Sequence, residues 1–223
     1  YQTVNGQGET VGKYANVYLP YGYDPEKPYN IFYLMHGGGG NADAWLDSCP
    51  LKNMLDQSIA SGELEPLIIV TPSYYTPGTG APGMDGEYHK TLAFQKELVE
   101  DLMPAVESAY HTFASSTDRE GLHASRMHRG FGGFSMGAVT TWNAFIRNID
   151  YIGYFMPLSG DCWAIERLGG SSQSEKTARY LHDAAAQSGY KPDEYFIYTL
   201  TGTGDIAFKQ VYGQVGAMLQ FPD

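Results

Sequence analysis

A serine lies between two glycines in the segment Gly133–Gly137, which reads Gly-Phe-Ser-Met-Gly. This pattern is typical of a nucleophile elbow, a sharp turn from strand to helix that exposes the serine hydroxyl above a sheet. The positive end of the following helix dipole would then stabilise an oxyanion beside Ser135. In a chain with 27 glycines, the pentapeptide alone is equally compatible with an ordinary glycine-rich turn. The assignment therefore depends on what other segments contribute.

Three further loops resemble the elbow in following a predicted strand. They are His36–Gly40 after the apolar run 30–35, Asp161 after the run 154–159, and Asp205 after the run 195–201. In open α/β sheets, ligands bind at the carboxyl ends of the strands. The four loops are therefore expected to meet at one site.

A histidine followed by glycines after a strand predicts an oxyanion hole, because backbone N–H groups there can approach an acyl oxygen closely. We assign the donors to Gly37 and Gly38, together with Met136 directly after the serine. Removing one such donor costs roughly 3 to 4 kcal/mol of transition-state stabilisation. A flexible surface turn is the alternative interpretation of the glycine run.

An acid that orients a histidine must accompany the serine, and two aspartates are candidates. Asp205 is preferred because it follows the later strand, which leaves Asp161 and Trp163 to line the substrate pocket with His36. Either aspartate could instead cap the helix that follows it, a common role for this residue type.

Strands that alternate with helices predict an α/β fold, with a mainly parallel central sheet flanked by helices in a single domain spanning 1–223. Predicted strands cover 14–19, 30–35, 67–71, 129–134, 154–159 and 195–201. Predicted helices cover 43–61, 90–110 with a kink at Pro104, 140–149, 175–188 and 211–219. The segment 73–86 is rich in glycine and proline, and we interpret it as a loop that forms a binding surface or a lid.

Composition narrows the range of partners. A formal charge of −11 argues against nucleic acid or an anionic membrane surface, and no apolar run approaches the length of a membrane span. Eighteen tyrosines suit a ligand with flat apolar faces. No metal-ligand motif or phosphate loop is present, so we expect neither metal nor cofactor. Cys49 and Cys162 are compatible with one disulfide or with two thiols.

Four motifs together resemble the feruloyl esterases of carbohydrate esterase family one, especially those built as modules into bacterial xylanases. The motifs are His36–Gly39, Gly133–Gly137, Pro157–Asp161 and Thr201–Asp205, and the likeness runs from about Tyr18 to about Met218. It implies an α/β-hydrolase fold and hydrolysis of hydroxycinnamoyl esters on feruloylated arabinoxylan through an acyl-enzyme. Ser135 would be the nucleophile and Asp205 the triad acid. It also implies an extracellular protein that belongs to a multimodular xylanase.

The catalytic histidine is where the chain departs from that family. In the family it follows the acid, yet no histidine follows Asp205, and all six lie upstream: His36, His89, His111, His123, His128 and His182. We therefore expect that a C-terminal segment of a few tens of residues, with the histidine and the last sheet elements, is missing from this sequence. Without the base, the serine would lose most of its activation.

Two other functions remain open. An acetylxylan esterase on the same scaffold would need less room, whereas Trp163, Tyr74 and Tyr75 favour a flat acyl group. A carbohydrate-binding relative without a working triad is compatible with the missing histidine, but not readily with the intact elbow, oxyanion loop and acid. Selectivity between ferulic and acetic esters would distinguish the two enzymes.

Overall fold

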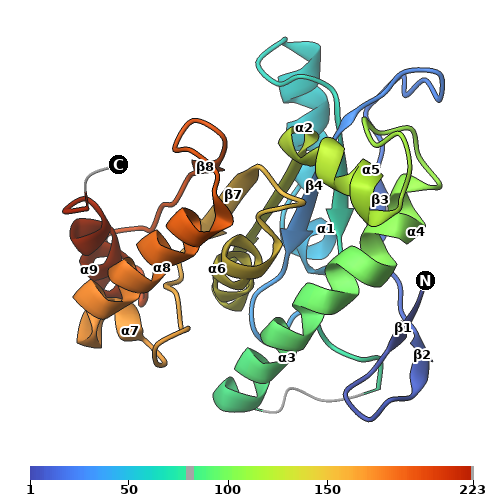
Figure 1. The fold of residues 1–223 in the computed structure, drawn as a ribbon. Helices are drawn as coiled ribbons and strands as arrows, with labels where there is room; N and C mark the ends of the chain where they lie inside the picture. Colours follow the sequence, from blue (N-terminus) through green and yellow to red (C-terminus); the bar gives the residue numbers. More distant parts are fainter. Residues whose placement is uncertain (79–82, 222–223) are drawn as a thin grey trace.

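A six-stranded sheet forms the centre of the molecule (Figure 1), with the order β3-β5-β4-β6-β7-β8. The computed structural model describes residues 1–78 and 83–221. The strands are β3 Asn16–Tyr18, β4 Asn30–Met35, β5 Leu67–Thr71, β6 Arg129–Phe134, β7 Tyr154–Leu158 and β8 Phe196–Ile197. Only β3 is antiparallel to its neighbour, so the prediction of a mainly parallel sheet is confirmed.

The middle strands are buried on both faces, which explains their continuous apolar sequences. The glycines of β6 are explained separately, by a side chain of the neighbouring strand β4. A Cβ atom on Gly130 or Gly132 would come within 2.4 or 2.8 Å of the Phe32 ring. The aromatic ring of β4 therefore occupies the space that side chains of β6 would need.

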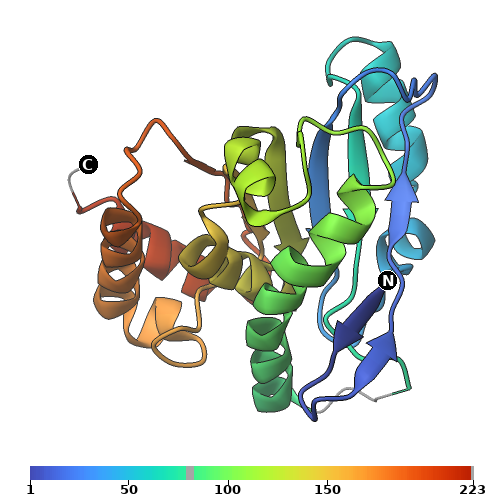
Figure 2. The same cartoon turned by 45° about the vertical axis from the view of Figure 1, so that its right-hand side comes forward.

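Helices cover both faces of the sheet. On one face lie α3 Met84–Glu97 and α6 Met136–Asn148, and on the other lie α1 Ala44–Ser48 and α2 Leu51–Ala60 (Figures 1 and 2). Buried amides join α3 to α6: Gln95 donates to the Thr140 carbonyl at 3.2 Å, and Asn148 donates to the Gln95 side chain at 3.0 Å. These bonds fix the helix that begins at the elbow against its neighbour.

The predicted helix around Pro104 is longer at its start and shorter at its end than expected. It runs through α3, a π-helical turn at Leu98–Leu102 and α4 Met103–Glu107. The wide turn places the Met103 N–H on the Leu98 carbonyl, five residues back. Because Pro104 has no N–H to donate, we attribute the local change of helix type to the proline.

A second group of helices lies beside the short strand β8. It consists of α7 Gly169–Ser172, α8 Ser174–Ser188 and α9 Phe208–Met218, which pack on one another (Figure 1). The remaining elements are the hairpin of β1 Gln2–Val4 with β2 Thr10–Gly12, the helix α5 Arg119–Ala124 and a 3₁₀ turn at Arg126–His128. Cys49 and Cys162 are both free thiols. Of the helices described, none has the length and apolar character that crossing a bilayer requires.

Candidate active site

Ser135 forms the turn between β6 and α6. Its backbone has φ 57° and ψ −115°, and its N–H donates to the Leu158 carbonyl at 2.9 Å. Such a conformation costs on the order of 1 to 3 kcal/mol in a non-glycine residue and persists where the surroundings enforce it. The enforcement comes from close packing, because a Cβ on Gly137 would lie 2.6 Å from the Met35 carbonyl oxygen. The predicted elbow geometry is therefore present, with the serine half-buried at its apex.

Residues 36–43 after β4, which we call the oxyanion loop for their predicted role, lie directly against Ser135, the predicted nucleophile. A Cβ built on Gly37 would be 3.4 Å from the Ser135 Cβ atom and 3.3 Å from the Phe134 carbonyl oxygen. Within the described residues, the N–H groups of Gly37 and Gly38 have no acceptor. Met136 is the first residue of α6, so its N–H lacks an intrahelical acceptor as well. Three donors thus remain available close to the serine.

The side chain of His36 holds this loop in place from inside the protein and is only 1% exposed. Its Nδ1 lies 2.7 Å from the Gly37 carbonyl, which can only accept, so Nδ1 carries the proton. Its Nε2 then accepts from the Ser73 hydroxyl at 2.8 Å. Burial lowers the pKa of His36 below its ordinary value, which favours this neutral tautomer.

Tyr75 and Glu87 hold the same loop from the other side, and the sequence analysis did not identify either as a loop support. The Gly39 N–H donates to the Tyr75 hydroxyl at 2.9 Å, and that hydroxyl donates to Glu87 Oε1 at 2.6 Å. Glu87 is 5% exposed, and its Oε2 has no partner among the described residues. Only the tyrosines of the 73–86 segment gave a sequence signal here, and they were interpreted as acyl contacts.

Asp161 is buried and both of its carboxylate oxygens are occupied. Oδ1 accepts from the Trp163 indole at 2.9 Å and Oδ2 accepts from the Gly170 N–H at 2.8 Å. Burial raises the pKa of Asp161 above its ordinary value, while these two hydrogen bonds act in the opposite direction. The carboxylate thereby joins the loop after β7 to α7.

Trp163 is itself only 6% exposed. His36, Asp161 and Trp163 therefore belong to the framework of the site in this structure. Their direct contact with substrate stays a prediction.

Asp205 lies at the start of the segment that leads into α9 and is half-buried. Its Oδ1 accepts from the Ala207 N–H at 2.7 Å, a short-range turn contact. Among the described residues no group hydrogen-bonds Oδ2. Unlike Asp161, this carboxylate has an oxygen free to accept from a histidine.

None of the six histidines hydrogen-bonds Ser135 or Asp205 in the described part of the chain. Apart from His36 and His89, each is engaged elsewhere: His111 with the Pro25 carbonyl, His123 with Tyr190, His128 with Asn30 and His182 with Asp183. His89 is exposed on α3. Across residues 1–78 and 83–221, no three His, Cys, Asp or Glu side chains gather as a metal site would require.

Comparison with known proteins agrees with this architecture. Endo-1,4-beta-xylanase Y of Acetivibrio thermocellus is 45% identical over 223 residues, which are 100% of this chain and 19% of that protein. An endo-1,4-beta-xylanase/feruloyl esterase of Xylanibacter ruminicola is 29% identical over 187 residues, or 81% of this chain and 24% of that protein. The chain thus spans about a fifth to a quarter of the length of these relatives.

A solved relative extends the comparison to three dimensions. The feruloyl esterase module of Clostridium thermocellum, crystallised as a serine-to-alanine mutant complexed with sinapinate, has 44% identity and a TM-score of 0.84. The match covers 100% of this chain and 72% of that module. The α/β-hydrolase fold and the resemblance to xylanase-associated feruloyl esterases are both confirmed. Residues 13–214 match the model of the putative esterase family, and the chain belongs to that family.

Proposed function

We propose that this chain is a feruloyl esterase domain that hydrolyses hydroxycinnamoyl esters of arabinoxylan through an acyl-enzyme on Ser135. The observation that carries the proposal is the close approach of the oxyanion loop to Ser135, since a Cβ built on Gly37 would lie 3.4 Å from the Ser135 Cβ. The names of the xylanase relatives and of the sinapinate complex support the acyl class. The same relatives support a place in an extracellular, multimodular xylanase.

Each step of the proposed reaction uses a group described above. The Ser135 hydroxyl attacks the ester carbonyl while the N–H groups of Met136 and of Gly37 or Gly38 stabilise the oxyanion. The tetrahedral intermediate collapses, the sugar leaves as the alcohol, and the acyl group stays on the serine. Water then attacks this acyl-enzyme and releases the hydroxycinnamic acid.

We propose further that the general base is a histidine outside residues 1–223, oriented by Asp205. The free carboxylate oxygen of Asp205 and the engagement of the upstream histidines away from Ser135 support this assignment. The solved relative also extends beyond the matched region. Asp205 would fix the imidazole tautomer while the imidazole removes the serine proton.

The test is the initial rate of methyl ferulate hydrolysis by the purified protein and by two variants. Ser135→Ala should lower the rate at least about a thousandfold, because the nucleophile is lost. Ser108→Ala, an exposed serine after α4, is the matched control and should keep the wild-type rate. Hydrolysis that persists in Ser135→Ala would contradict the proposed nucleophile.

The same assay separates the remaining alternatives. A higher kcat/KM for methyl ferulate than for an acetate ester is expected, and the reverse would favour an acetylxylan esterase. If the 223-residue chain shows no rate above that of Ser135→Ala, the assay is repeated on a chain extended at its C-terminus. Continued inactivity of the extended chain would favour the non-catalytic relative.

A further inference from the structure

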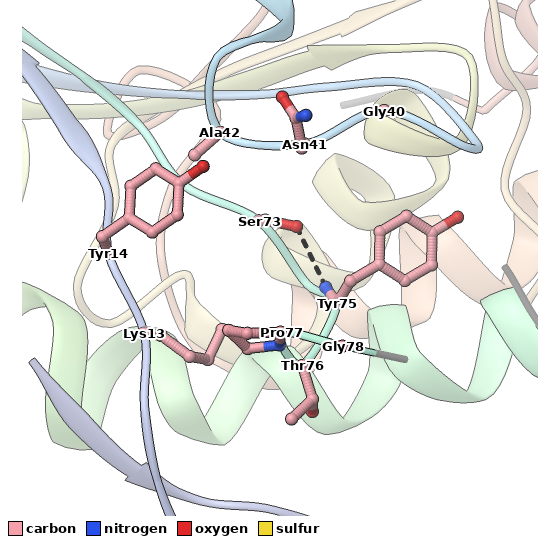
Figure 3. A pocket seen from close by; sticks show the side chains of 10 residues that line it. All are labelled: Lys13, Tyr14, Gly40, Asn41, Ala42, Ser73, Tyr75, Thr76, Pro77 and Gly78. Carbon is pink, nitrogen blue, oxygen red and sulfur yellow. Dashed lines mark hydrogen bonds between the residues drawn. The ribbon is translucent and has the colours of Figure 1, made fainter. Parts of the chain in front are cut away.

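A pocket of about 270 Å³, which we call the tyrosine pocket, opens beside the oxyanion loop (Figure 3). Three segments line it: Lys13 and Tyr14 before β3, residues 40–42 of the oxyanion loop, and Ser73 with residues 75–78 after β5. Of these residues, the sequence analysis singled out only Tyr75, as a contact of a flat acyl group, and the structure uses its hydroxyl as a support of the loop. The pocket is smaller than a typical site for a drug-sized ligand and suits a single small ring.

The tyrosine pocket is within reach of an ester bound at Ser135. Gly37 lies against the Ser135 Cβ atom, and Gly40 lines the pocket. These two residues are three positions apart, and three residues of extended chain span at most roughly 10 Å. An ester whose carbonyl oxygen occupies the oxyanion hole can therefore extend one of its two halves over the loop toward the pocket.

Two aromatic residues from different segments line the pocket, and Figure 3 shows Tyr14 on one side of it and Tyr75 on the other. The Tyr75 ring already stacks on His36 and has Lys90 over it at 6.0 Å, so the exposed Tyr14 offers the more accessible ring. Both are fixed by their hydroxyl groups. Tyr14 donates to Asp43 Oδ2 at 2.8 Å, while Tyr75 is held between Gly39 and Glu87. Walls that are already ordered bind a ring without a further loss of side-chain entropy.

The charge of the pocket favours a neutral ligand. Among the described residues that line it, the one cation is Lys13, which is buried and pairs with Glu97 at 2.6 Å, so the ammonium is neutralised inside the protein. At the rim, the exposed Asn41 side chain has an N–H₂ group with no acceptor among the described residues. The Tyr14 hydroxyl oxygen can still accept a hydrogen bond. Apolar ring faces with a few neutral donors and acceptors match a hydroxylated ring.

From this combination we propose that the tyrosine pocket is a subsite for a pentose of the polysaccharide half of the ester, packed against Tyr14 and bordered by Tyr75. The inference rests on the proposed esterase function, because it takes the alcohol half of that substrate as the ligand. It adds that residues 40–42, on the side of the oxyanion loop away from Ser135, help to select the polysaccharide.

Binding is measured by calorimetry on the Ser135→Ala protein, so that esters survive. The three ligands are methyl ferulate, an arabinoxylo-oligosaccharide without ferulate, and the same oligosaccharide carrying ferulate. We expect the feruloylated oligosaccharide to bind about tenfold more tightly than methyl ferulate, since one ring face is buried in addition. Adding Tyr14→Ala should abolish this difference, and Tyr14→Phe, which keeps the ring, should preserve most of it.

Tyr21→Ala is the matched control, because Tyr21 is 93% exposed and does not line the pocket. It should leave all three affinities unchanged. Equal affinity for methyl ferulate and the feruloylated oligosaccharide would overturn the subsite. So would a Tyr14→Ala effect of the same size on methyl ferulate, which would instead place the acyl ring in the pocket.

The oligosaccharide without ferulate distinguishes failure of the subsite from failure of the proposed function. If methyl ferulate is neither bound nor hydrolysed, the esterase proposal fails. Tyr14-dependent binding of the plain oligosaccharide would still support a sugar subsite in that case. No binding of the plain oligosaccharide, with methyl ferulate bound and the ferulate-bearing oligosaccharide no tighter, would overturn the subsite alone.

Discussion

At the scale of single residues, His36 shows how the same side chain can be read as a ligand contact or as a support. From its place after a strand and before glycines, the sequence analysis assigned it to the lining of the substrate pocket. The structure uses both ring nitrogens inside the protein, on the Gly37 carbonyl and the Ser73 hydroxyl. The imidazole therefore fixes the loop that carries the proposed oxyanion donors.

The buried neutral state of His36 predicts a pH dependence of stability. The folded-state pKa lies below the unfolded value of about 6.5, so the unfolded state binds more protons as the pH falls below that value. Stability should therefore decrease on acidification, by at most about 1.4 kcal/mol per pH unit from this group. Above pH 6.5 both states are neutral and the contribution disappears.

The measurement is the free energy of unfolding in urea between pH 5 and 8, the range around that value. His36→Gln should be less stable throughout but should lose part of the slope below about pH 6.5. His89→Gln, at an exposed position on α3, should keep the wild-type slope. Parallel curves for His36→Gln and the wild type would refute the assignment.

At this scale, the sequence did not predict in which direction the side chains at the strand ends point. The loops of Ser135, His36, Asp161 and Asp205 were all placed after strands, and the structure has each of them there. Whether a carboxylate at a strand end turns toward solvent or into the protein depends on partners far along the chain. Asp161 meets Gly170, which no local pattern connects to it.

At the scale of elements, prediction succeeded where burial alone sets the pattern. The strands 30–35 and 67–71 have the predicted bounds, because a strand covered on both faces needs a continuous apolar run. The strand 129–134 also has its predicted bounds, which were set by the elbow that follows it. The segment 195–201 retains only Phe196–Ile197 as a strand. In that edge segment the side chains of Phe196, Tyr198 and Leu200 are exposed. The apolar residues predicted a strand here, but among the described residues nothing buries their side chains.

Other elements were missed for different reasons. The helix predicted over 43–61 is interrupted at Cys49–Pro50, where the proline begins a new helix instead of continuing the first. The hairpin β1–β2 has strands of three residues, too short to show an alternating pattern. The π turn before Pro104 was missed because the sequence analysis predicted only a kink at the proline, and not the wider turn that accommodates it.

The helix α9 provides a matched pair of substitutions at two glycines. A Cβ on Gly213 would lie 2.4 Å from the Gly170 carbonyl oxygen of α7, whereas a Cβ on Gly216 meets nothing within 4 Å. Gly216→Ala should raise the free energy of unfolding by about 0.5 to 1 kcal/mol through helix propensity. Gly213→Ala should lower it by about 1 to 3 kcal/mol, because α7 and α9 must separate.

Thermal or urea unfolding of both variants measures this difference. Since both changes have the same intrinsic effect on helix formation, their difference reports the contact between α7 and α9. Similar stabilisation by both substitutions would show that the two helices do not pack as closely as described.

At the scale of the whole molecule, the candidate active site and the main polar support lie at opposite edges of the sheet. Ser135 follows the last residue of β6, while Arg129 is its first residue. Arg129 pairs with Glu107 through two hydrogen bonds of 2.6 and 2.8 Å, and both side chains are almost fully buried. Tyr33 of β4 and Thr112 also donate to the same carboxylate.

Glu107→Gln should destabilise the protein by about 3 to 5 kcal/mol, because it leaves a buried guanidinium without its counter-charge. Glu100→Gln is the control, since Glu100 pairs with Arg119 at a partly exposed site and should cost about 0 to 1 kcal/mol. Urea denaturation measures both. Equal, small losses would mean that the buried pair does not hold the strands and helices together.

The close approach of the backbone around Ser135 also determines which substitutions the protein can accept. Gly37, Gly133, Gly137 and Gly160 belong to three separate segments, and at each one an added Cβ would contact neighbouring main-chain or elbow atoms at 2.6 to 3.4 Å. None of these four residues contributes a reactive side chain. A map of tolerated substitutions would therefore show a group of positions around Ser135 that accept only glycine. This group would mark the candidate active site by the lack of space for side chains, without reference to any catalytic side chain.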